Sequence, residues 1–259
     1  MSEPLVLLDD TARVRTITLN RPQALNSFNN DLYWAAADAF VAAGDDPGVA
    51  VVLITGSGRG FSAGQDISEM GGSSTSTETR GNGFGAFVDG LAAFRKPVVA
   101  AVNGVAVGIG ATMLPLCDLV FVSDAARIKT PFPTLGVCPE AASSVTFPRT
   151  MGWQQAAYTL FTADWLTAED AVRTGLAFRR CTPEALLDEA GALARRIAAM
   201  PIPSLVETKR LMVAGRIDTV MAARERENEA FTRLIGGPAN VEAIAAFLEK
   251  RDPDFTGIA

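Results

Sequence analysis

Two turns rich in glycine and alanine hold the groups of this chain that are best suited to chemistry. They are GRGFSAGQDI at residues 58–67 and NGVAVGIGATML at residues 103–114, and each follows a β-branched apolar run. Small residues leave backbone N–H groups uncovered, and the first N–H groups of a helix have no internal partner. Two such donors that converge on one point could stabilise a carbonyl oxygen as it becomes negative. Each turn alone is also typical of a tight connection between a strand and a helix.

The chain contains no histidine. This composition excludes a Ser–His–Asp triad, a Cys–His pair and a histidine metal site, because each needs an imidazole. The cysteines Cys117, Cys138 and Cys181 have no metal-like spacing and leave one thiol unpaired, so we expect reduced thiols and no metal. Proton transfer must therefore use a carboxylate, a lysine, a tyrosine or a cysteine.

Length and composition indicate a globular chain with a large core. The 259 residues suffice for one large domain, or for one domain with a smaller appendage, and 48% of them are hydrophobic. The formal net charge of −6 argues against a nucleic-acid binder but allows a phosphate-bearing small molecule. We find no charged-then-apolar leader and no apolar run of the ~18 residues that a membrane span needs. We therefore expect a cytoplasmic protein that binds neither nucleic acid nor a membrane.

Hydrophobic periodicity predicts alternating strands and helices over the first half of the chain. Leu5–Leu8 and Arg13–Leu19 are predicted to form a hairpin around a turn at residues 9–11. The further predicted elements are a helix over residues 31–43, a strand over 49–55, a helix over 84–94, a strand over 98–102, a short helix through Leu116 and a strand over 119–123. The least hydrophobic window, residues 71–83, predicts a mobile surface loop that could also cover a binding site.

Helices dominate the prediction for the second half. Residues 167–170 form a capping box for a short helix that ends at Gly175, and another helix runs from Pro183 to about Ala199. Three helices follow the interruption at Pro201, over residues 204–214, 217–235 and 241–250. An apolar stripe on the second of these favours packing, within or between subunits. The pattern predicts an α/β body over residues 1–200 and a C-terminal helical region over residues 201–259.

The two glycine turns resemble the signature turns of the crotonase (enoyl-CoA hydratase/isomerase) superfamily. The similarity lies in FSAGQDI and in the NG-containing segment that ends in Cys117-Asp118, and it extends over nearly the whole chain. It implies an α/β fold, a crotonase-like spiral of ββα units with a C-terminal helical trimerisation region, and a homotrimer or a dimer of trimers. It also implies that the N–H groups of Ala63 and Ile109 form an oxyanion hole for the thioester carbonyl of an acyl-CoA.

The same resemblance implies further contacts to the acyl-CoA. CoA enters as part of the substrate, and no metal or redox cofactor is expected. Two of the implied contacts have plainer interpretations, a solvated helix end for Lys250 and an aromatic that packs the tail for Phe247. The positions that match the family's CoA-binding residues are Ala24, Leu25, Asp66, Ile67, Phe247 and Lys250.

Two departures from the family bear on the reaction. Hydratases of this superfamily carry two glutamates that hold and activate water, whereas the matching positions here are Thr112 and Phe132. Neither side chain is a base at neutral pH. Efficient hydration through paired carboxylates is therefore not expected, and Phe132 is assigned to the substrate pocket.

A different carboxylate, Glu140, lies in the segment TPFPTLGVCPEAASS at residues 130–144. This segment resembles the peroxisomal-type Δ3,Δ2-enoyl-CoA isomerases, whose catalytic glutamate sits at the matching place. The resemblance implies that Glu140 moves a proton from carbon 2 to carbon 4 of a 3-enoyl-CoA, with apolar neighbours such as Phe132 and Val137 raising its pKa. The plainer interpretation of Glu140 is a carboxylate at a helix N-terminus, favoured by the helix dipole.

Three other functions remain open. The chain could be an enoyl-CoA hydratase, which Thr112 and Phe132 argue against, or a non-catalytic acyl-CoA-binding protein, which Glu140 argues against. An acyl-CoA hydrolase or dehalogenase would need a nucleophile or a water-activating carboxylate, for which Asp66 is a weak candidate. The sequence does not indicate the length of the acyl chain or the geometry of its double bond.

Overall fold

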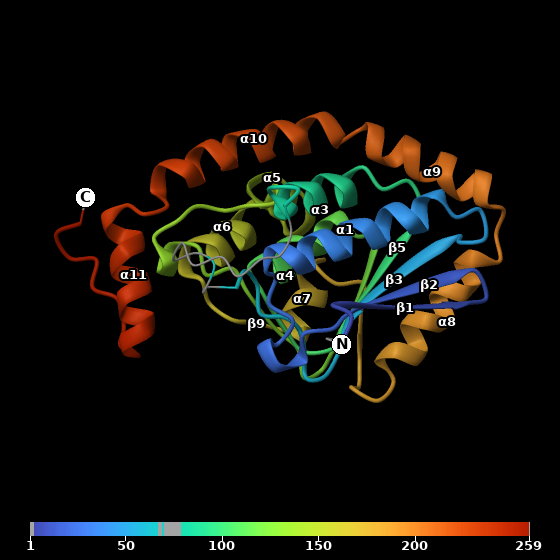
Figure 1. Ribbon diagram of the computed structural model, residues 1–259, viewed down its shortest axis with the longest axis horizontal. Coiled ribbons are helices and arrows are strands. Elements are labelled where there is room, and N and C mark those ends of the chain that lie inside the picture. Colours follow the sequence, from blue (N-terminus) through green and yellow to red (C-terminus); the bar gives the residue numbers. More distant parts are fainter. Residues whose placement is uncertain (1–2, 67–68, 70–78, 259) are drawn as a thin grey trace.

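A six-stranded sheet forms the centre of the chain in the computed structural model, which describes residues 3–66, 69 and 79–258 (Figure 1). The strand order is β1-β2-β3-β5-β7-β10, and every neighbouring pair is parallel except β1 with β2. The strands are β1 (Val6–Thr11), β2 (Val14–Leu19), β3 (Val51–Gly56), β5 (Val98–Val102), β7 (Leu119–Ser123) and β10 (Arg179–Cys181).

Helices cover both faces of this sheet, which explains why its central strands are apolar throughout. In β3, Val52 and Ile54 pack on the face covered by α1 (Asn30–Asp45) and α3 (Gly83–Ala92). Val51 and Leu53 face the opposite side, where they meet α8 (Leu186–Ala198). Figure 1 shows α1 and α3 above the strands and α8 below them.

A second sheet of four short strands positions the chemically interesting segments. Its order is β4-β6-β8-β9, with β4, β6 and β8 parallel and β9 antiparallel. Because parallel neighbours end at the same edge, the residues that follow β4, β6 and β8 are brought together there. The strands are β4 (Gly60–Ser62), β6 (Val105–Val107), β8 (Arg127–Lys129) and β9 (Leu166–Thr167).

Short helices connect the two sheets. Thr167 and Asp170 form the expected capping box at the start of α7. The helices are η1 (Pro22–Ala24), α4 (Ile109–Thr112), η2 (Leu114–Leu116), η3 (Pro133–Leu135), α5 (Ser143–Met151), α6 (Trp153–Thr162) and α7 (Ala168–Arg173).

The last three helices are α9 (Ile202–Ala214), α10 (Ile217–Leu234) and α11 (Pro238–Glu249). In Figure 1, α9 and α10 run along one side of the molecule, and α11 stands at its end beside the C-terminus. Helix α10 contacts both α3 and α5, and Arg224 on α10 forms an ion pair with Asp89 on α3 at 2.8 Å. The C-terminal helices therefore return to the body of the molecule.

The structure confirms the α/β architecture and most of the predicted elements, with corrections at the edges. The hairpin turns at Ala12 and Arg13, both with positive φ, instead of at residues 9–11. This register places Asp10 opposite Arg15, with which it forms an ion pair. The sequence prediction lacked all four strands of the small sheet and β10, because strands of two or three residues leave almost no periodic signal. It also lacked α5 and α6.

Two further sequence-based predictions concern a surface loop and membrane-spanning helices. The predicted loop at residues 71–83 lies mostly outside the described residues, and its end, residue 83, begins α3. Over the described ranges, no helix combines the length and the apolar character that crossing a membrane would require.

Candidate active site

A cavity of about 990 Å³ opens where the ends of β4, β6 and β8 meet the C-terminal helices. The two glycine turns form one wall, and the segment from Pro131 to Glu140 forms another. Helices α10 and α11 close it from the far side, through residues that include Glu227, Phe231 and Phe247. The cavity therefore draws on both the α/β body and the C-terminal helices.

The two glycine turns pack directly against each other. Gly64 has φ +93°, and a Cβ there would lie 2.8 Å from the carbonyl oxygen of Val107. Gly108, with φ +53°, is the residue before α4, and its Cβ position lies 3.7 Å from the Cα of Gly64. Only glycine allows this backbone conformation together with so close an approach. The turns predicted from sequence to converge do converge.

The amides that the turns leave free are those of Gln65 and Ile109. Across the described residues, neither N–H contacts an acceptor, whereas the flanking amides of Asp66 and Gly108 donate to Phe28 and Lys129. Ile109 is the first residue of α4, so its N–H has no partner within the helix. These two amides are the candidates for an oxygen-binding pair.

The assignment of Ala63 as the second donor is wrong. Its N–H donates to the carbonyl oxygen of Leu25 at 2.9 Å and cannot also serve a ligand. Ala63 still lines the cavity, as does Gln65. The error arose because the sequence indicates an exposed turn but does not show which amide of that turn donates to a carbonyl oxygen of the loop at residues 24–26.

Glu140 faces this pair of turns. Its Oε1 lies 3.9 Å from the Cβ position of Gly108 and accepts a long hydrogen bond of 3.4 Å from Thr112 Oγ1. Glu140 lies just before α5, as its plainer interpretation requires, but its carboxylate does not receive the amides at the start of that helix. The amides of Ala142, the residue before α5, and of Ser144 donate to Glu227, and that of Ser143 donates to the backbone carbonyl of Glu140.

The surroundings of Glu140 favour its protonated form. Its pKa is raised to about 7, chiefly by burial and then by the nearby carboxylate of Glu227, while the Thr112 hydroxyl and the Arg224 guanidinium act in the opposite direction. Phe132 and Val137 are both buried and share the cavity wall with Glu140. A carboxyl group with this pKa can accept and return a proton near neutral pH.

Of the two positions that match the hydratase glutamates, only Phe132 lines the cavity. Thr112 is fully buried at the end of α4, and Phe132 is 4% exposed in the cavity wall. Neither supplies a charge, so Glu140 is the carboxylate next to the free amides.

Sequence reasoning missed two other carboxylates of the cavity, Glu69 and Glu227. Glu69 Oε2 accepts from the amide of Asn30 at 2.9 Å, while its Oε1 is buried without a partner. The pKa of the Tyr33 phenol is held well above its usual range, mainly by burial and also by the charges of Glu140 and Glu69. Tyr33 therefore lies close to both carboxylates. Glu227 lies in no motif and is far from both turns in the sequence, so no spacing could have identified it.

The predicted CoA-binding positions are only partly gathered at the cavity. Phe247 lines it, whereas Lys250 ends α11 with an exposed side chain that does not. The Asp66 carboxylate forms an ion pair with Arg21 at 3.0 Å and is not part of the cavity wall, which removes its weak case as a nucleophile. Ala24 and Leu25 lie in the loop that holds Ala63, and Ile67 lies outside the described residues.

The cysteines offer no competing base or nucleophile. All three are free thiols, as expected. Burial raises the pKa of Cys117 to about 12 and that of Cys181 to about 11, and it also raises the pKa of Cys138. A thiol that stays protonated at neutral pH is a poor base and a poor nucleophile.

Comparison with known proteins agrees with the fold. The family model for enoyl-CoA hydratase/isomerase matches residues 9–258. Two Escherichia coli relatives, 1,2-epoxyphenylacetyl-CoA isomerase and 2,3-dehydroadipyl-CoA hydratase, are each 34% identical; the alignments cover 94% and 99% of this chain and 95% and 100% of theirs. The crystal structure of an enoyl-CoA hydratase/isomerase from Pseudoalteromonas atlantica has a TM-score of 0.91 and 33% identity, over 97% of this chain and 99% of that one.

The relatives include both isomerases and hydratases, so they identify the family and not the reaction. The family model and the structural match both extend over nearly the whole chain. The chain belongs to the enoyl-CoA hydratase/isomerase family, within the crotonase superfamily.

Proposed function

We propose that this enzyme is a Δ3,Δ2-enoyl-CoA isomerase, which converts a 3-enoyl-CoA to the conjugated 2-enoyl-CoA. The observation that carries the proposal is the placement of Glu140, with a pKa of about 7, across from two free amides, without a carboxylate at Thr112 or Phe132. One carboxyl group that gains and loses a proton suffices for this reaction.

The thioester oxygen binds between the N–H groups of Gln65 and Ile109. The protons on carbon 2 are acidic because they lie between this carbonyl and the alkene. Glu140 removes one of them, and the electrons of the broken C–H bond delocalise as a dienolate whose charge rests largely on the thioester oxygen. The two amides stabilise this charge as it develops, which lowers the barrier.

Glu140 then returns the proton to carbon 4, which leaves the double bond between carbons 2 and 3. The net reaction moves one proton and consumes no water. The apolar wall of Phe132 and Val137 keeps the carboxyl poorly solvated, so both directions of proton transfer stay accessible near neutral pH.

Hydration is the second candidate function, and Glu69 is the specific observation in its favour. Its buried Oε1 has no hydrogen-bond partner and belongs to a cavity residue, so a water molecule could bridge Glu69 and Glu140. Such a pair would restore the two carboxylates that hydration requires. Against it, Glu69 Oε2 is already fixed by the Asn30 amide at the start of α1.

The experiment that separates the two candidates compares both reactions of the purified enzyme. One assay follows the ultraviolet absorbance of the conjugated thioester formed from 3-hexenoyl-CoA, and the other follows hydration of crotonyl-CoA. We expect isomerisation to be well above hydration, and Glu69→Gln to leave isomerisation within about 5-fold of wild type. A hydration rate equal to the isomerisation rate, lost in Glu69→Gln, would make the enzyme a hydratase.

The remaining sequence-based expectations belong to the same proposal. The acyl-CoA extends from the amide pair towards Phe247, with Ala24, Leu25 and Lys250 near its CoA portion. We also propose a homotrimer or a dimer of trimers in the cytoplasm, and light scattering of the purified protein tests the assembly. A monomer at micromolar concentration would contradict it.

A further inference from the structure

Glu227 is a buried carboxylate that accepts three hydrogen bonds from another segment of the chain. It lies on α10 and is 6% exposed. Its Oε2 accepts from the amide of Ala142 at 2.6 Å, and its Oε1 accepts from the amide of Ser144 at 2.9 Å and from the Ser144 hydroxyl. Burial raises the pKa of Glu227, but every donor here is an N–H or O–H directed at the carboxylate, and these hydrogen bonds together with the Arg224 charge favour its ionised form.

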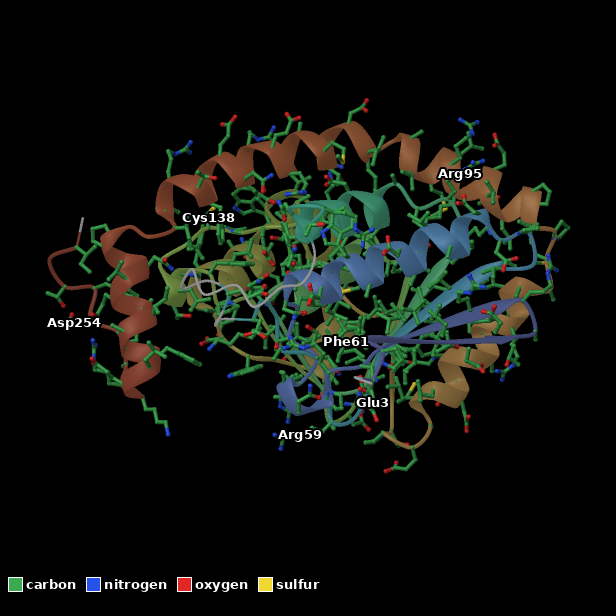
Figure 2. All side chains as sticks on the ribbon, viewed as in Figure 1. Glu3, Arg59, Phe61, Arg95, Cys138 and Asp254 are labelled. Atoms are coloured by element: carbon green, nitrogen blue, oxygen red, sulfur yellow. The ribbon has the colours of Figure 1, made fainter. Side chains whose placement is uncertain are left out.

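These contacts fix the segment that carries Glu140. Ala141 and Ala142 both adopt left-handed backbone conformations, with φ of 54° and 60°. Such conformations are unfavourable for alanine, so the surroundings must hold them. The amide of Ala142 and the start of α5 are held by Glu227, and Cys138 on the other side of Glu140 contacts the Glu227 carbonyl oxygen through its thiol at 3.7 Å. Figure 2 shows Cys138 beneath α10.

Helix α10 has a second attachment besides Glu227. One turn earlier, Arg224 is 5% exposed, pairs with Asp89 on α3 and lies over the Phe84 ring. Arg224 holds α10 on α3, whereas the side-chain hydrogen bonds of Glu227 go to the segment that follows Glu140.

We propose that Glu227 is a positioning residue for the reaction: it holds the Glu140 loop in its left-handed turn and keeps a fixed negative charge beside the Glu140 carboxyl. This inference rests on the proposed role of Glu140 and assigns to the C-terminal region a share in the chemistry. Glu227 does not exchange a proton with the substrate.

The charge has a definite direction of effect. Among the described residues, the groups that interact with Glu140 are Glu227 and Arg224 from α10, Tyr33 from α1 and Thr112 from α4, with Cys138 on its own segment, and Glu69 lines the same cavity. Among those whose charge acts on Glu140, Glu227 raises its pKa and Arg224 lowers it. Removal of the Glu227 charge, with Arg224 in place, must move the titration of Glu140 to lower pH.

The test uses Glu227→Gln, which keeps the size and shape of the side chain. It replaces one carboxylate oxygen, an acceptor, with an NH2 group, a donor that would face the amide N–H of Ala142 or Ser144. We expect kcat for isomerisation to fall about 10²-fold with KM little changed, because a misplaced base loses rate before binding. The acid limb of the pH profile should move to lower pH. Glu225→Gln, an exposed position on the same helix, is the matched control and should change neither quantity.

Two further variants separate positioning from folding. Ser144→Ala removes only the hydroxyl contact and should lower kcat less than Glu227→Gln does, with an unchanged melting temperature. Glu227→Asp keeps the charge and should keep the pH limb near its wild-type place while it loses some of the rate. A Glu227→Gln enzyme with lower activity at every pH but an unmoved limb would overturn the proposal, since a purely structural role predicts that result.

A readout without turnover keeps this inference separate from the proposed function. Carbon-13 NMR of glutamate-labelled protein gives the Glu140 carboxyl signal as the one missing from Glu140→Gln. Its titration should move to lower pH in Glu227→Gln whichever reaction the enzyme performs. If that titration stays unchanged, the inference about Glu227 fails; if it moves but 3-enoyl-CoA is not isomerised, only the proposed function fails.

Discussion

On one side of the cavity, the groups that face a bound thioester are the backbone amides of Gln65 and Ile109; on the other, the facing group is the side chain of Glu140. The amide side is built from neighbouring strands and two glycines in contact. The carboxylate side is built from a left-handed loop, a short helix and a buried glutamate from α10. The amide side depends on the absence of side chains at its glycines, whereas the carboxylate side depends on the identity of the side chains around Glu140.

This difference determines how each side responds to substitution. Changing a side chain on the amide side leaves the donors in place unless it separates the two turns. Changing one on the carboxylate side alters either the base itself or the charge around it. The predictions below use this distinction, from the largest expected effect to the smallest.

Glu140→Gln tests the carboxylate side at its centre. It removes the proposed base and should lower isomerase turnover by roughly 10³-fold or more, with the fold and CoA binding retained. Steady-state kinetics on 3-hexenoyl-CoA, with circular dichroism as the folding control, measure the effect. Retention of more than about a tenth of the wild-type rate would remove Glu140 from the reaction.

Gly64→Ala tests the amide side by pushing the turns apart. The new Cβ would lie 2.8 Å from the Val107 carbonyl oxygen, so the turns must separate, and we expect kcat to fall about 10²-fold. The pH limb should stay in place, because Glu140 is not altered. Gly152→Ala is the matched control: it also has positive φ, at +78°, but its Cβ would meet no atom within 4 Å. Equal losses in the two variants would show that backbone strain, and not the amide pair, is responsible.

The wild-type pH profile tests the burial of the base. Glu140 must be ionised to accept the first proton, and its pKa is about 7, so kcat/KM should rise with pH up to about neutrality and then level off. At pH 6 about a tenth of the plateau value should remain, provided that preincubation at pH 6 causes no irreversible loss. A limb near pH 4.5, the ordinary value for a glutamate, would mean that the carboxyl is solvated in the working enzyme.

Thr112→Val makes the smallest change to the carboxylate side. The hydroxyl that it removes donates to Glu140 Oε1 at 3.4 Å and lowers the Glu140 pKa, so the limb should move to higher pH. The plateau of kcat/KM should stay within about 3-fold of wild type, since so long a hydrogen bond is weak. An acid limb displaced to lower pH would contradict the hydrogen bond from Thr112 to Glu140.

The same distinction explains what the sequence could predict. Local pattern predicted that the turns converge, and the family resemblance implied the role of Ile109; the free amide of Ile109 is consistent with that role, since a helix that begins after Gly108 leaves its first amide without a partner. The choice between Ala63 and Gln65 depends on the Leu25 carbonyl, which lies far away in sequence. Local pattern cannot report a hydrogen bond of that kind.

Glu140 was found through a motif, whereas its partners were not. Glu227 lies in the stretch RERENEA, where charged residues are frequent and nothing marks one of them as buried. Its importance arises only when α10 packs on α5, a contact between distant segments. Glu69 was missed for a similar reason, because its burial depends on the start of α1.

The pKa of Glu140 has a practical consequence in a chain without histidine. Most proteins take up or release protons near neutrality through several imidazoles, which obscure any single group. Here Glu140, with a pKa of about 7, and the terminal amine are the groups expected to exchange protons in this range. Calorimetric titration with a substrate analogue in two buffers of different ionisation heat should therefore count the protons exchanged at the catalytic carboxyl almost without background.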